Sequence, residues 1–123
     1  MKNVAVVGCT VTLSPGEGVA QITTQASLKV KADGKGVYFG PIDIAVSEYS
    51  DETITVSGSG SGTITIQPSA QKVKVEGEYV ILEGDSGSAL IDGKAQSGTS
   101  HVDVQSNVTA KIEVAGQVKV KAN

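Results

Sequence analysis

The stretch Lys72-Val73-Lys74-Val75-Glu76-Gly77-Glu78-Tyr79-Val80 decides the fold, because it spells a β-hairpin in nine residues. Apolar and polar side chains alternate before the glycine, which would place Val73 and Val75 on one face of a strand and the lysines on the other. Gly77 can adopt the positive φ of a tight turn, and Tyr79 and Val80 would begin the return strand. We therefore expect a hairpin with one buried face and one solvated face.

Two other stretches follow the same plan. They are Lys29-Val30-Lys31-Ala32-Asp33-Gly34-Lys35-Gly36-Val37 and Lys111-Ile112-Glu113-Val114-Ala115-Gly116-Gln117-Val118. The lysines are 43 and then 39 residues apart, and a recurrence of this length indicates a repeat architecture. The pattern predicts turns at Gly34 and Gly116 and core positions at Val30, Ile112 and Val114. One hairpin is marginal alone, so three would bury their apolar faces around a shared axis.

The fold class expected is all-β: a small cone or prism of short hairpins with three internal pseudo-repeats and pseudo-threefold symmetry. We expect a single domain over residues 1–123, with repeat cores at about residues 22–40, 64–85 and 101–121. Between the first two, Ser-Gly repeats at 57–62 predict a hairpin tip joining strands 53–56 and 63–66. Asp92-Gly93 predicts a tight turn before a polar segment at 94–100. No segment has the apolar spacing of an amphipathic helix.

Composition excludes several classes of protein. The net charge is −3 and its signs are interspersed, whereas a nucleic-acid partner requires a clustered basic face. No run of eighteen apolar residues exists that could span a membrane as a helix. The apolar run at residues 4–7 is too short for a signal peptide, so we expect synthesis in a cytoplasm and, if the protein leaves it, export by another route.

The central stretch continues to Gly84-Asp85, which gives the pattern Lys-Val-x-Val-x-Gly-x-x-Val-x-x-x-Gly-Asp over residues 72–85. This pattern resembles the repeat unit of the PAAR and PAAR-like spike-tip proteins, and the partial copies at 29–40 and 111–120 extend the resemblance over most of the chain. Members of this family resemble a short β-cone whose broad base sits on a trimeric spike. They belong to contractile phage tails, tailocins and type VI-like secretion systems.

The resemblance implies a structural protein that caps and sharpens the central spike and helps it pierce the target envelope. Its partners would be a homotrimeric β-helical spike and, transiently, the target membrane. Its location would be the tail tip of a virion or of a secreted injection particle, assembled in the bacterial cytoplasm without a signal peptide. Typical members hold a vertex metal with three histidines and a cysteine, whereas this chain has only Cys9 and His101 as weak candidates. A structural zinc takes four ligands, so we expect no metal and no other cofactor.

The sequence gives less support to an enzymatic function. Gly84-Asp85-Ser86-Gly87-Ser88 resembles the nucleophile segment of trypsin-like proteases, but the single histidine follows it and the chain is too short for two barrels. A β-turn explains the segment better. Chemistry by Cys9 with His101 is formally allowed, yet a partly buried cysteine in a strand is far more common. We expect no catalytic residues, and so no enzyme.

Two other functions fit an all-β chain of this size. One is a phage capsid decoration or cement protein, which would be an obligate oligomer. The other is a secreted β-module that binds carbohydrate or a surface receptor. Binding platforms of that kind display exposed aromatic side chains, and this chain has only Tyr38, Phe39, Tyr49 and Tyr79.

Overall fold

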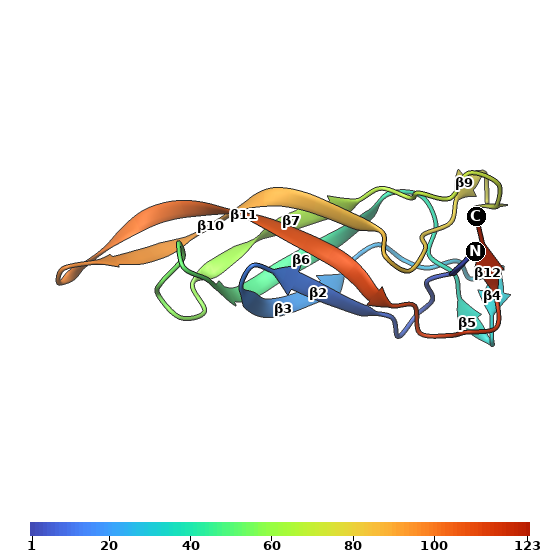
Figure 1. The fold of residues 1–123 in the computed structure, drawn as a ribbon, viewed down its shortest axis with the longest axis horizontal. Helices are drawn as coiled ribbons and strands as arrows, with labels where there is room; N and C mark the ends of the chain where they lie inside the picture. The colour runs from blue at the N-terminus through green and yellow to red at the C-terminus, as the bar shows by residue number, and fades with distance from the viewer.

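The computed structural model describes residues 1–123 and confirms the all-β class, with twelve strands and no helix. It therefore holds no helix able to cross a membrane. The molecule is elongated, with a long hairpin at one end, a barrel in the middle and short hairpins at the other end (Figure 1). The strands are β1 (Lys2–Asn3), β2 (Thr10–Ser14), β3 (Glu17–Ile22), β4 (Lys31–Ala32), β5 (Lys35–Gly36), β6 (Ile42–Ser50), β7 (Gly60–Ile66), β8 (Lys74–Val75), β9 (Glu78–Tyr79), β10 (Ser86–Ser97), β11 (Ser100–Val114) and β12 (Lys121–Ala122).

Six strands form one antiparallel sheet in the order β2-β11-β10-β7-β6-β3. Its first and last strands, β2 and β3, are consecutive in the chain and lie side by side, so the sheet is a nearly closed barrel. Strands β10 and β11 pair without interruption from Ser86↔Lys111 to Ser97↔Ser100. Their far part extends beyond the barrel to a narrow end (Figure 1).

The barrel core consists mostly of isoleucine, with valine, alanine and tyrosine. Strand β6 shows why these residues form it: Ile42, Ile44 and Val46 are buried while Asp43 between them is exposed, which is the two-residue period of a half-buried strand. Branched side chains suit a narrow space between facing strands. The buried core residues of the barrel are Ala5, Tyr38, Ile42, Ile44, Val46, Tyr49, Ile54, Ile64, Ile66, Ile81, Ile91, Val108, Ala110 and Ile112.

The opposite end holds three hairpins of two-residue strands: β4–β5, β8–β9 and β1–β12. We call residues 1–7, 27–40, 70–83 and 115–123 the three-hairpin end. In the first two hairpins, Asp33-Gly34 and Glu76-Gly77 form the turns with positive φ at both positions. The third hairpin joins the beginning and the end of the sequence, since Lys2 pairs with Ala122.

The structure corrects the prediction of a third hairpin at 111–118. Lys111, Ile112 and Val114 lie in β11, between β10 and β2, because alternation that starts at residue 101 continues to 114 and both neighbours pair with it. Ile112 is buried in the barrel core, but Val114 is 52% exposed, so its assignment to a repeat core is wrong. Gly116 has a positive φ, yet its turn joins no pair of hydrogen-bonded strands.

Two other predicted core positions are also wrong. Val30 and Val73 are 39% and 40% exposed, whereas Val75 is buried. The chain bends at residues 28–29 and again at 71–72, and each strand starts only after the valine. The alternation of a strand therefore does not reach these two residues.

The middle of the chain also differs from the strands and turns that the sequence predicts. Residues 53–56 form a loop rather than a strand, and strand β7 already begins at Gly60, within the Ser-Gly segment that was predicted to be a hairpin tip. Strand β10 runs straight through Asp92-Gly93, where a turn was predicted. Gly93 is needed there for close approach, because a Cβ on it would lie 2.4 Å from Cγ2 of the buried Ile54.

Candidate functional site

Three backbone hydrogen bonds link the three hairpins in a closed ring. The N–H of Ala5 donates to the carbonyl of Ile81 (2.8 Å), Ile81 donates to Tyr38 (3.0 Å), and Tyr38 donates to Ala5 (3.1 Å). A second set of three bonds links the same hairpins in the opposite direction. Its bonds run from Val7 N–H to Gly36, from Gly40 N–H to Tyr79 and from Glu83 N–H to Asn3. The hairpins are therefore connected cyclically, and over the two sets each hairpin donates to both neighbours and accepts from both.

Contacts near the turns follow the same cycle. Ser27 Oγ donates to Glu76 Oε2 at 2.8 Å, which joins the first hairpin to the second. Lys72 N–H donates to the carbonyl of Asn123 at 3.2 Å, which joins the second to the third. Lys119 pairs with Asp33 at 3.2 Å, which joins the third to the first. The three acceptors, Asp33, Glu76 and Asn123, thus occupy equivalent places, whereas the donors and the chemistry of the contacts differ.

The first ring separates two cores. Its members Ala5, Tyr38 and Ile81 belong to the barrel core. The residues on either side of them point the other way, as strand alternation requires, and fill a smaller core between the hairpins. The buried members of that smaller core are Val4, Val6, Ala32, Val37, Ala70, Val75, Val80, Leu82 and Ala122.

The surface of the three-hairpin end carries one tripeptide three times. Lys-Val-Lys occurs at residues 29–31, 72–74 and 119–121, just before the buried positions Ala32, Val75 and Ala122. The three valines are 39%, 40% and 42% exposed. The sequence pattern that required a following glycine missed the copy at 119–121, because the third hairpin has no continuous turn. The tripeptide alone would have found it.

Charge is strongly unequal along the molecule. The three-hairpin end contains eight of the ten lysines and four of the thirteen acidic residues, which gives it a formal charge of +4. The rest of the chain has two lysines and nine acidic residues and carries −7. The near-neutral total therefore conceals a basic end and an acidic barrel.

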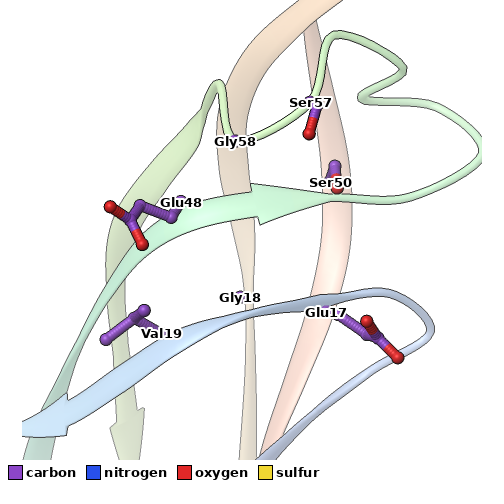
Figure 2. Close-up of a pocket in the computed structure, with 7 residues that line it drawn as sticks. All are labelled: Glu17, Gly18, Val19, Glu48, Ser50, Ser57 and Gly58. Atoms are coloured by element: carbon purple, nitrogen blue, oxygen red, sulfur yellow. The ribbon is translucent and has the colours of Figure 1, made fainter.

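The largest hollow lies elsewhere, between β3 and β6 (Figure 2). It has a volume of about 610 Å³, and Val19 is its one hydrophobic lining residue. The carboxylates of Glu17 and Glu48 lie at opposite sides of it, so they do not form an acid/base pair (Figure 2). A shallow polar hollow without convergent groups is not a typical small-molecule site.

The structure keeps Cys9 and His101 apart. Cys9 precedes Thr10, which pairs with the last residue of β11, whereas His101 is the second residue of that fifteen-residue strand. At about 3.3 Å per residue, the two positions are roughly 40 Å apart. Burial raises the pKa of Cys9 to about 11, and a backbone hydrogen bond offsets part of this, so its sulfur is a thiol at neutral pH. No three His, Cys, Asp or Glu side chains lie together in a group that could hold a metal ion.

The segment at 84–88 has a structural role. Asp85 is buried and accepts hydrogen bonds from the N–H groups of Ser69 (3.2 Å) and Leu82 (2.8 Å) and from the Ser69 hydroxyl. Ser86 begins strand β10 and is exposed. Asp85 therefore fixes the connection between the second hairpin and the barrel, and no histidine approaches the serine.

A second carboxylate holds the loop at 51–54 against the barrel. Asp51 accepts hydrogen bonds from Tyr49 Oη (2.9 Å), Ser106 Oγ (2.5 Å) and the N–H groups of Thr53 and Ile54 (2.7 Å each). Burial alone would raise the pKa of Asp51, but these hydrogen bonds outweigh it and the pKa is lowered.

We expect Asp51→Asn to lower the free energy of unfolding by about 2 kcal/mol at pH 7, because an amide cannot accept all four bonds. A lowered folded-state pKa stabilises the protein above the unfolded value of about 3.9, and that stabilisation is lost as the pH falls through the folded value. The difference between wild type and variant in urea unfolding should therefore shrink between pH 5 and pH 2, within roughly the range that such linkage covers. Asp43→Asn is the matched control, since Asp43 accepts one exposed side-chain bond, from Thr65. A difference that stays constant with pH would contradict the assignment.

Comparisons with known proteins identify no relative: the chain matches no protein family, no curated protein and no solved structure.

Proposed function

We propose that the protein caps and sharpens the trimeric central spike of a contractile injection machine and helps it pierce the target envelope. The observation that carries this proposal is the cyclic connection of the three hairpins, Ala5 to Ile81 to Tyr38 and back. One chain that presents three similar faces about an axis can meet three identical subunits of a trimer at once.

The shape supports the same role. The hairpins β4–β5, β8–β9 and β1–β12 lie together at one end, and the molecule narrows at the other to the hairpin β10–β11 (Figure 1). In this proposal the three-hairpin end sits on the spike and the narrow end leads. The work is mechanical rather than catalytic, and continuous pairing over twelve residues of each strand would make the leading hairpin stiff. The particle would assemble in the bacterial cytoplasm and carry the tip outside.

The test is co-expression with the homotrimeric β-helical spike protein of an injection particle from the same source. Light scattering after size-exclusion chromatography should give a monomer for the isolated protein and one copy per spike trimer for the complex. A spike lacking its terminal turns is the control and should not bind. If the protein forms a trimer by itself and does not bind the spike, the result would contradict the proposal and would instead favour a capsid cement protein.

A further inference from the structure

We infer that the three Lys-Val-Lys segments form a docking face for the acidic, threefold-symmetric end of a homotrimeric protein, with the valines on apolar residues and the lysines on carboxylates. This inference rests on the proposed function for the spike as natural partner. The threefold and acidic character of the surface it binds follows from the exposed residues alone.

The first argument is that the three hairpins have identical residues at exposed positions rather than at most of the buried ones. Buried positions that occupy equivalent places agree at one site, where all three hairpins have valine (Val4, Val37 and Val80), but they differ widely at others. Ser27, Ala70 and Gln117 share one such place, and Tyr38, Ile81 and Ala5 share another. The exposed tripeptide is identical in all three. Packing constrains buried residues far more than exposed ones, so the fold alone does not require this identity. Contact with three identical partners would require the same exposed residues on all three hairpins.

The second argument is the equal exposure of the three valines, from 39% to 42%. A lone exposed apolar side chain is ordinary, but three in equivalent places, with Leu28 and Val118 also 77% and 73% exposed beside them, make an apolar ring. Apolar side chains flanked by charged ones are typical of the composition of a protein interface.

The third argument is charge complementarity. The lysines that flank the valines are all exposed, and the end as a whole carries +4. Only Lys119 among them forms an ion pair, with Asp33, while Lys74 lies over the ring of Tyr79. Most of these ammonium groups are therefore free to pair with carboxylates of a partner, which would steer association and favour acidic surfaces.

The decisive variant is Lys29→Glu/Lys72→Glu/Lys119→Glu, which reverses one charge on each hairpin. A second variant, Val30→Ser/Val73→Ser/Val120→Ser, removes the apolar ring and keeps the lysines. The control is Lys94→Glu/Lys111→Glu, which changes the two lysines outside this end. All of these side chains are exposed or partly exposed, and thermal unfolding would verify that each variant folds.

Three probes separate the explanations. The first is the spike trimer itself. The second is a three-stranded coiled coil whose free end carries three glutamates around apolar residues, compared with a monomeric form of the same peptide and with a lysine-ended trimer. The third is a phosphatidylglycerol-containing vesicle. We expect both acidic trimers to bind the wild type, with affinity reduced roughly 100-fold by either triple variant and less than about 3-fold by the control.

The outcomes distinguish this inference from the proposed function. Loss of spike binding in the control but not in the triple variants would overturn the docking face and leave the tip function standing. Binding to the acidic coiled coil but not to the spike would support the face and overturn the tip function. Equal binding to trimer and monomer, binding to vesicles alone, or binding to neither trimer would overturn the inference.

Discussion

Ile81→Ala is expected to lower the free energy of unfolding by about 4 kcal/mol, among the larger effects of a single core truncation. Ile81 is fully buried, and its backbone both donates and accepts within the ring that joins the three hairpins. Because that ring fixes the backbone of Ala5 and Tyr38 around it, the cavity cannot easily collapse, which increases the cost of the lost methyl groups.

Urea unfolding followed by circular dichroism would measure this effect. Hydrogen exchange provides a local check, since the amide hydrogens of Ala5 and Tyr38 should exchange faster in the variant than in the wild type. Leu90→Ala is the control, because Leu90 is 61% exposed and its truncation should change stability by less than about 0.5 kcal/mol. A loss below about 1 kcal/mol for Ile81→Ala would show that the ring is not a tightly packed junction.

Gly87→Ala should cost about 3 kcal/mol, although it adds only one methyl group. A Cβ at Gly87 would lie 2.0 Å from the carbonyl oxygen of Thr65 and 3.2 Å from Cα of Ile66. Both contacts are with the backbone of β7, so no side chain can turn away, and β10 must separate from β7 to make room.

The same unfolding measurement tests this prediction, with Ser86→Ala as the control on the neighbouring exposed position. Amides of β7 should lose protection in the Gly87 variant, whereas those of β2 on the far side of β11 should keep it. Unchanged stability would mean that the two strands can part at little cost.

The all-β class was predictable because alternation and turn glycines are local properties. Ile42-Asp43-Ile44 indicates a half-buried strand in any context, and Asp33-Gly34 indicates a turn. The errors arose where a residue's role depends on a distant neighbour. Position 93 requires glycine because the side chain of Ile54 packs against its backbone. The sequence pattern, which contains no information about Ile54, predicts a turn at the same glycine.

The candidate docking face was predictable only in part. Two copies of Lys-Val-Lys precede a turn glycine, and the third at 119–121 completes its hairpin with residues 2–3 instead. No local pattern links those two segments, so the sequence favours Lys111, which a glycine follows, over Lys119 as the start of the third copy. Charge separation was hidden for a related reason: basic segments at 29–35, 72–74 and 119–121 come together only in the folded molecule.

The third hairpin also sets an order of events during synthesis. Asn3 can pair with Lys121 only after residue 121 has left the ribosome, a sequence separation close to the full length of the chain. Strands β3, β6 and β7 can pair long before that, and long-range contacts carry the largest loop-closure entropy. The basic face therefore cannot form before residue 121 has left the ribosome, and a partner that recognises it meets only molecules whose translation has passed this point.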